Sequence, residues 1–343
     1  MRMVLPGVVC DPLGLTQTGT QIARRCTVAC DSAKTFPLPP QQGMADRMMD
    51  AASPRQTHDS HNPAGARGAR KPTIALALGG GGARGLAHIC VLETLDELGL
   101  EVVALSGTSI GAILGAAYAA GLSGTALRAH VTSTLRNRGE VMSRLLKARV
   151  GRFSELVRGA AANPVLLDGE AFLDLFWPTA VPDRFEELKR PLQVVATDYW
   201  NRCAAVFETG PLAPAVAGSM AIPGLIRPVK AGERVLVDGG AVNPLPFGLL
   251  AGKADLVIAC DVTGGPLPGR HAAPKAIEAI LGSAQIMQAT ITNEMLMRST
   301  PDILVRPDVD AFRALDFFRV AQILEASERV KDDLRRQLAP HLI

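Results

Sequence analysis

Aromatic residues are scarce in this 343-residue chain, since Phe, Tyr and Trp together make up 4% of it. A groove that stacks sugar rings or single-stranded bases needs such side chains, so this class of binding site is disfavoured. The main part of the chain also lacks an excess charge: residues 1–70 carry eight Lys or Arg and five Asp or Glu, and residues 71–343 carry 28 of each. Nucleic acid is therefore not expected as a partner.

Paired cysteines are also absent. The six cysteines include no Cys-x-x-Cys pair, which favours reduced thiols and a cytoplasmic location. No cluster of His, Cys and carboxylates has the spacing of zinc ligands, so neither a metal nor another cofactor is expected.

The first 70 residues lack any sustained hydrophobic periodicity and contain no Glu. We expect a disordered tail, because such a composition does not offset the entropy of ordering the chain. Pro6, Gly7 and Asp11 interrupt the one apolar run that resembles a signal peptide. Met44, Met48 and Met49 offer alternative starts within this tail.

The rest of the chain is rich in apolar residues and alternates between strand and helix patterns. A buried strand at 74–78, a helix that ends near Gly99 and a second strand at 102–105 predict a βαβ unit with parallel strands. Further strands are predicted at 192–197, 234–237 and 256–260. We therefore expect an α/β fold with a mainly parallel central sheet.

Two other segments have helical patterns. Residues 122–190 predict a helical cap over a domain of residues 71–310, and residues 311–343 predict an amphipathic helix packed on that domain. Residues 102–127 carry no charge, so a membrane span is an alternative for them. Ten of these 26 residues are Gly, Ser or Thr, which favours a buried strand, a tight turn and a core helix.

Ser109 lies where the second strand passes into a helix, flanked by Gly107 and Gly111. A sharp turn at that point exposes a hydroxyl and leaves no room for side chains two residues away on either side. The helix that follows also directs its N-terminal N–H groups at the site, which favours a developing negative charge. This context predicts a nucleophile, and the alternative is a tight core turn.

The glycine run 79–82, followed by Arg84 and Gly85, has two interpretations. Gly80-x-Gly82-x-x-Gly85 satisfies a dinucleotide fingerprint, but the acid expected about 20 residues later is missing. The alternative is an oxyanion hole, in which the backbone N–H groups of Gly80, Gly81 and Gly82 bind a tetrahedral intermediate. The missing acid favours the oxyanion hole.

No histidine has the sequence position that a base for this serine would need. His58 and His61 belong to the tail, and His88, His130 and His271 are interpreted as surface or packing residues. Asp238 follows a predicted strand and precedes Gly239 and Gly240, which is also the pattern of a common turn. A carboxylate activates a hydroxyl only when it is desolvated and directly hydrogen-bonded to it.

Together, the glycine run with Arg84, the Gly107-Thr108-Ser109-Ile110-Gly111 turn and Asp238-Gly239-Gly240 resemble the patatin-like phospholipase family. The likeness extends from about Thr73 to about Pro307 and includes the stretch 218–223. One departure is Trp200-Asn201-Arg202, where family members often have a shorter turn. The departure concerns the rim of the site.

The resemblance implies a three-layer α/β/α fold and a Ser109–Asp238 dyad that acts without histidine. It assigns the glycine loop with Arg84 to the oxyanion hole, and it implies hydrolysis of lipid acyl esters through an acyl-serine. Transient contact with the inner membrane face is then expected. Apolar residues near 165–167 and 172–177 are either core or acyl-chain contacts. A non-enzymatic regulator with this fold and a dinucleotide enzyme are the alternative functions.

Overall fold

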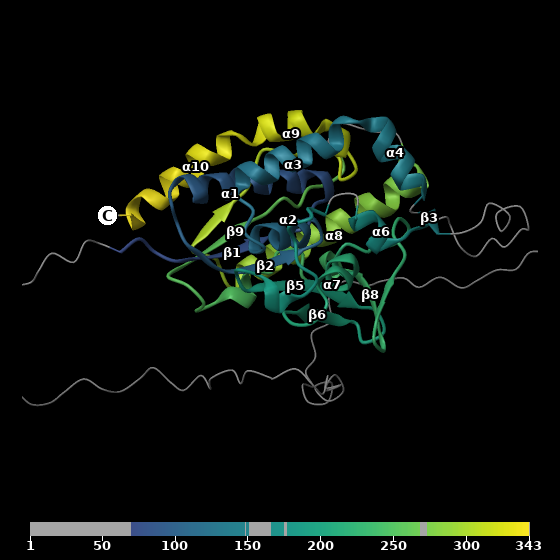
Figure 1. Cartoon of the computed structure of the whole chain (residues 1–343), viewed down its shortest axis with the longest axis horizontal. Helices are drawn as coiled ribbons and strands as arrows, with labels where there is room; N and C mark the ends of the chain where they lie inside the picture. Colours follow the sequence, from purple (N-terminus) through teal and green to yellow (C-terminus); the bar gives the residue numbers. More distant parts are fainter. Residues whose placement is uncertain (1–69, 148, 151–165, 175–176, 268–272, 343) are drawn as a thin grey trace, which may run out of the picture. The chain divides into compact units, whose positions relative to one another are not determined.

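The computed structural model describes residues 70–147, 149–150, 166–174, 177–267 and 273–342 (Figure 1). The tail predicted at 1–70 therefore lies outside the described residues, except for Arg70. An eight-stranded sheet runs through the centre of the described part. The order in which its strands are hydrogen-bonded determines which loops meet at its edge.

Seven strands follow one another in the order β10-β9-β1-β2-β5-β8-β7, and β6 pairs with β5. The strands from β10 to β5 are parallel to their neighbours, whereas β6, β7 and β8 pair in antiparallel fashion. Their bounds are β1 Ile74–Leu78, β2 Val102–Thr108, β5 Leu192–Asp198, β6 Cys203–Phe207, β7 Val229–Ala231, β8 Arg234–Asp238, β9 Leu256–Cys260 and β10 Ile303–Val305. The mainly parallel α/β fold predicted from the sequence is confirmed.

The alternation of side chains along β1 divides the core between the two faces of the sheet. Ile74, Leu76 and Leu78 belong to the larger core, together with residues of α1, α2, α3, α9 and α10. Ala75 and Ala77 point the other way and pack with residues of η4 and α8. Figure 1 shows α1, α3, α9 and α10 together along one side of the sheet. The result is three layers, as the resemblance implied.

The helices begin and end as follows: α1 His88–Glu97, α2 Ile110–Ala119, α3 Gly124–Arg136, α4 Arg138–Lys147, α6 Gly169–Leu173, α7 Leu212–Ser219, α8 Ala276–Arg298, α9 Val320–Ser327 and α10 Arg329–Leu338. Three short 3-10 helices matter for the site: η1 Gly82–Ala87, η3 Gly239–Ala241 and η4 Phe247–Leu250. A two-stranded ribbon, β3 Arg149–Val150 with β4 Leu166–Leu167, lies within the predicted cap.

Two expectations for long segments are resolved by these bounds. The uncharged residues 102–127 form β2, α2 and the start of α3, so they do not span a membrane. No helix in the described part of the chain has both the length and the apolar character needed to cross a bilayer. The single C-terminal helix expected at 311–343 is two helices, because α9 ends at Ser327 and α10 starts at Arg329.

Candidate active site

Ser109 occupies the turn between β2 and α2 with a backbone conformation that is rare for a residue with a side chain. Its φ is 55° and its ψ is −120°. Neighbouring backbone crowds this turn: a Cβ at Gly111 would lie 2.1 Å from the carbonyl oxygen of Leu78, and one at Gly107 would lie 2.6 Å from that of Gly111. Both glycines are therefore required for the chain to turn this sharply at Ser109.

A second serine holds the backbone of Ser109. The Ser109 N–H donates to the hydroxyl oxygen of Ser219 at 2.8 Å, and that hydroxyl donates to the carbonyl oxygen of Val195 at 2.5 Å. Ser219 is completely buried at the end of α7. Sequence reasoning gave this residue no role of its own, although it lies in the stretch that carries the family resemblance.

Asp238 ends β8 and is 6% exposed, as is Ser109. Its Oδ1 accepts the N–H of Gly240 at 2.7 Å. Burial raises the pKa of this carboxyl group from 3.8 to about 6, while the Gly240 N–H and a hydrogen bond from the Ser109 hydroxyl act in the opposite direction. The two residues, 129 positions apart in the sequence, thus lie close enough in a buried setting for the Ser109 hydroxyl to influence the pKa of Asp238.

The glycine loop runs between the end of β1 and η1, beside Ser109. A Cβ at Gly80 would lie 3.5 Å from that of Ser109. Gly79 and Gly80 donate their N–H groups to the carbonyl oxygens of Cys260 and Pro244, at 3.0 and 2.9 Å. The Gly80 N–H is therefore already committed within the fold, which counts against its predicted place in an oxyanion hole.

Three other N–H groups near Ser109 have no such acceptor. Gly81 and Gly82, at the start of η1, and Ile110, the first residue of α2, donate to no carbonyl among the backbone hydrogen bonds of the described residues. Ile110 was not a candidate in the sequence, although the residue after the nucleophile commonly contributes to an oxyanion hole at such a turn. The backbone N–H groups of Gly81, Gly82 and Ile110 are thus the ones that remain available to bind an oxyanion.

The Arg84 side chain lies away from the cavity that contains Ser109. It is 1% exposed, its Nη1 donates to the carbonyl oxygen of Phe312 at 3.4 Å, and a Cβ at Gly264 would lie 2.0 Å from it. Burial lowers the pKa of the guanidinium, and the nearby carboxylates, foremost Asp310, raise it. The guanidinium therefore packs beneath the loop and supports it, and the assignment of Arg84 to the oxyanion hole stays a prediction.

Two of the described histidines lie near the glycine loop and the cavity. His88 is fully buried and its Nε2 donates to the carbonyl oxygen of Gly79 at 2.8 Å, so it supports the glycine loop as a packing residue. Burial lowers the pKa of His88 to about 4, so its ring is neutral at physiological pH. His130 lies on α3 and lines the cavity next to Ser109. His58, His61 and His271 lie outside the described residues.

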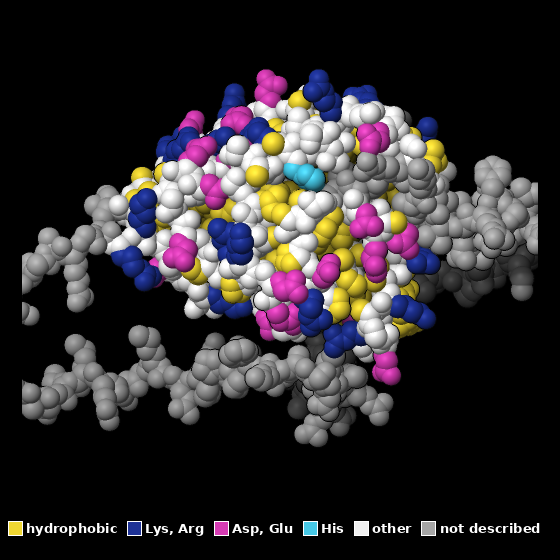
Figure 2. Space-filling model, viewed as in Figure 1, with side chains coloured by type: hydrophobic (Ala, Val, Ile, Leu, Met, Phe, Trp, Pro, Cys, Tyr) yellow, Lys and Arg dark blue, Asp and Glu magenta, His cyan; other side chains and the backbone are white. Residues whose placement is uncertain are grey.

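An apolar cavity of about 220 Å³ begins at Ser109. Ile110, Ile113, Leu114 and Ala117 line it along one face of α2, at the spacing that places side chains on the same side of a helix. Figure 2 shows apolar side chains below α3, in the middle of the face that Figure 1 displays. The rest of the lining comes mainly from α3, α4, the 220–226 segment and the 314–318 segment.

The apolar candidates from the cap divide between the lining of the cavity and the buried core. Leu167 and Phe172 line the cavity, whereas Leu173 is a buried core residue. Trp200, in the departure from the family pattern, is 71% exposed in the turn between β5 and β6 and is not among the cavity residues. The expected effect of this departure on the rim of the site stays a prediction.

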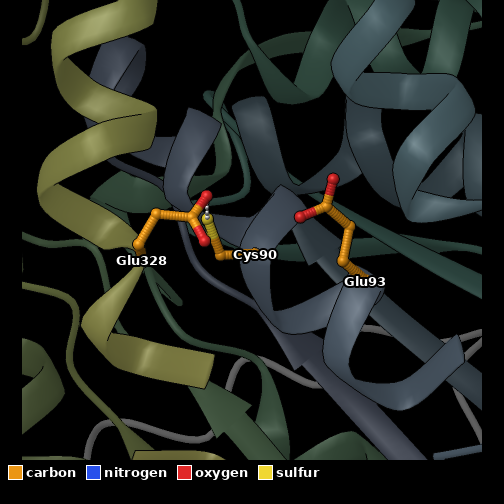
Figure 3. A group of neighbouring side chains, drawn as sticks. All are labelled: Cys90, Glu93 and Glu328. Carbon is orange, nitrogen blue, oxygen red and sulfur yellow. Dashed lines mark hydrogen bonds between the residues drawn. The ribbon is translucent and has the colours of Figure 1, made fainter. Parts of the chain in front are cut away.

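Cys90, Glu93 and Glu328 lie within metal-ligand reach of one another, 4.8 Å at most (Figure 3). Two cations already occupy their neighbourhood: Arg128 binds Glu93 and Glu328 at 2.6 Å each, and Lys331 binds Glu93 at 2.7 Å. Burial raises the pKa of the Cys90 thiol to about 11, so it is protonated at neutral pH. This donor set fits an ion-pair network that joins α1, α3 and α10, rather than a metal site.

Known proteins share this sequence pattern. An uncharacterized NTE family protein of Mycobacterium tuberculosis is 36% identical over 251 residues, which cover 73% of this chain and 61% of the relative. The human patatin-like phospholipase domain-containing protein 6 is 29% identical over 279 residues, which cover 74% of this chain and 19% of that protein. The chain thus spans less than two thirds of the length of these relatives.

Solved structures with similarity to this chain include two bacterial proteins. ExoU of Pseudomonas aeruginosa, in its complex with SpcU, matches with a TM-score of 0.40 and 18% identity over 80% of this chain and 52% of its own. VipD of Legionella pneumophila matches with a TM-score of 0.38 and 14% identity over 77% of this chain and 67% of its own. The patatin-like phospholipase family model matches residues 76–251, about half of the chain, and the protein therefore belongs to the patatin-like phospholipase family.

Proposed function

We propose that this protein is a serine acyl hydrolase that cleaves acyl esters of phospholipids or related lipids. The observation that carries the proposal is that the buried Ser109 and Asp238 side chains lie close to each other where an apolar cavity starts. A carboxylate is a weak base in water, and desolvation strengthens it. The raised pKa of Asp238, about 6, is a sign of that effect.

In the first half of the reaction, Ser109 Oγ attacks the ester carbonyl carbon and its proton passes to Asp238. The negative charge moves to the carbonyl oxygen, where the N–H groups of Gly81, Gly82 and Ile110 are available as donors. The tetrahedral intermediate then collapses: the carbon–oxygen bond to the alcohol breaks, and the alcohol takes the proton from Asp238. An acyl-serine remains.

In the second half, Asp238 accepts a proton from a water molecule that attacks the acyl-serine. The fatty acid leaves as the Ser109 hydroxyl is restored with that proton. The acyl chain lies in the apolar cavity, because burying its methylene groups supplies binding energy that a polar site does not. Since such substrates reside in membranes, the proposal includes transient contact of the protein with a lipid surface, in the cytoplasm.

A fluorophosphonate probe tests the nucleophile, because it phosphonylates an activated serine. We expect labelling of Ser109 in the wild type, release of fatty acid from phospholipid or lysophospholipid micelles, and loss of both in Ser109→Ala and Asp238→Asn. Ser327→Ala is a matched control: Ser327 is also fully buried, and its hydroxyl donates to a backbone carbonyl in α9, that of Ile323. A wild type that neither reacts with the probe nor releases fatty acid from any lipid would favour the regulatory alternative.

A further inference from the structure

The segment Ser219–Ala221 contacts the backbone of both residues of the proposed dyad. Its first residue accepts the Ser109 N–H at 2.8 Å through its side chain, and its last residue accepts the Asp238 N–H at 3.0 Å through its carbonyl oxygen. Two residues that are 129 positions apart in the sequence thus have their main chains held by the same three-residue segment.

The Ser219 hydroxyl is oriented by its own donor bond. A serine hydroxyl has one proton to donate and two lone pairs that accept. Its proton goes to the carbonyl oxygen of Val195 at 2.5 Å, so a lone pair remains directed at the Ser109 N–H. Because Ser219 is completely buried, water cannot substitute for either bond.

The same region of β5 also supports the Asp238 side of the site. The Thr197 hydroxyl donates to the carbonyl oxygen of Asp238 at 2.8 Å. Gly239 lies so close to the carbonyl oxygen of Val195 that an added Cβ would be 2.1 Å away. The Val195 carbonyl therefore lies beside both the Ser219 hydroxyl and the turn that follows Asp238.

Ser109 needs such support because its backbone is strained. With φ at 55°, it adopts a conformation that a non-glycine residue keeps only where its surroundings impose it. Its N–H lies at the N-cap of α2, outside the hydrogen bonds of the helix, and Ser219 is its acceptor. Loss of that acceptor would leave a buried N–H unpaired and allow the turn to relax.

We propose that Ser219 is a positioning residue for hydrolysis, which fixes the Ser109 backbone so that the Ser109 hydroxyl stays against Asp238. This inference rests on the proposed function, because it assigns Ser219 a role in that reaction. It predicts that Ser219 governs the rate of acylation rather than the binding of the acyl group. The hydrogen bond from Ser109 lowers the pKa of Asp238. Removal of the Ser219 hydroxyl should weaken that bond, so the pKa of Asp238 should rise.

The test measures the rate of fluorophosphonate labelling against probe concentration and pH. For Ser219→Ala we expect a maximal labelling rate ten to a hundred times lower, an unchanged half-saturating probe concentration, and a pH midpoint above that of the wild type. Ser219→Thr retains the hydroxyl and should restore much of the rate. Ser219→Cys keeps the shape of the side chain with a weaker hydrogen-bonding group, and its rate should lie between those of Ser219→Ala and the wild type.

The outcomes separate this inference from the proposed function. An unreactive wild type refutes the proposed function and this inference along with it. If the wild type reacts and Ser219→Ala has the same labelling rate and pH midpoint, the inference alone is overturned. Ser219→Cys replaces Ser219→Ala in this comparison if Ser219→Ala does not fold. An equal loss of rate in Ser327→Ala, the buried serine in α9, also overturns the inference alone, because the effect would then follow from the loss of any buried hydroxyl.

Discussion

The proposed function predicts that the substitution Ala117→Leu shortens the acyl chain that the enzyme uses best. The cavity follows α2 from Ser109 to Ala117, and none of the described residues of α2 beyond Ala117 lines it. Eight residues at 1.5 Å each give a length of about 12 Å. A chain of single bonds advances about 1.2 Å per bond when extended, as three backbone bonds span about 3.6 Å, so about ten carbons fit.

The size of the effect follows from the burial of methylene groups. Each one contributes about 0.8 kcal/mol, which is roughly a fourfold change in kcat/KM. We therefore expect kcat/KM to rise with chain length up to about ten carbons and then to level off. A leucine at position 117 fills the last turn of the cavity, about 5 Å along the helix, which removes space for about four carbons. The ten-carbon ester should lose up to about 3 kcal/mol, roughly two orders of magnitude.

The assay is competition within one reaction, with straight-chain esters of four to eighteen carbons in a single population of mixed micelles. Mass spectrometry of the released acids then gives relative kcat/KM values that share the same interface. Activity on the four-carbon ester and the thermal midpoint report whether Ala117→Leu is correctly folded. Leu127→Ala, on α3 at the same cavity, should change the profile in the opposite direction. A wild-type rate that keeps rising to sixteen carbons, or a variant with the wild-type profile, would refute the reasoning.

Three further predictions concern charge. In the proposed reaction, acylation requires ionised Asp238, so the labelling rate should fall tenfold per pH unit below about pH 6. A flat rate down to pH 4 would contradict this role. Because folding raises this pKa from 3.8 to about 6, the ionised carboxylate destabilises the fold above pH 6 and not below pH 4. Urea unfolding of Asp238→Asn should therefore show a gain of up to about 3 kcal/mol at pH 8 and little at pH 4, and equal gains would exclude this cause. Arg128→Met leaves the buried Glu93 with Lys331 alone and should cost about 2–3 kcal/mol in the same assay, whereas an unchanged midpoint would contradict the assigned network.

Much of the sheet was predictable from local patterns. The strands expected at 74–78 and 256–260 have these bounds in the structure, because continuous apolar runs are typical of strands buried on both faces. The strand expected at 102–105 continues to Thr108, since its parallel pairing with β1 and β5 extends into the turn. The 23-residue helix α8 was missed, because the chain gives little charge contrast between its two sides.

The parts of the site that the sequence did not predict depend on contacts between distant segments. Arg84 was assigned by its place in a motif, but its direction is set by the 261–264 and 310–316 segments that pack against it. The Gly80 N–H was expected to be free, and the carbonyl of Pro244 takes it. In the sequence, Ser219 has no feature that distinguishes it from other residues at helix ends. Its role depends on contacts with β5 and with the turn at Ser109, which only the fold brings together.

The distance along the chain between Ser109 and Asp238 has a consequence during protein synthesis. A ribosome adds about 5–20 residues per second, so the carboxyl group is made roughly 6–26 s after the hydroxyl it contacts. Throughout that interval the nascent polypeptide carries the serine without the carboxyl group that the proposed reaction requires. In the proposed mechanism, chemical competence therefore appears only when β8 has been translated and has joined the sheet, after most of the domain is complete.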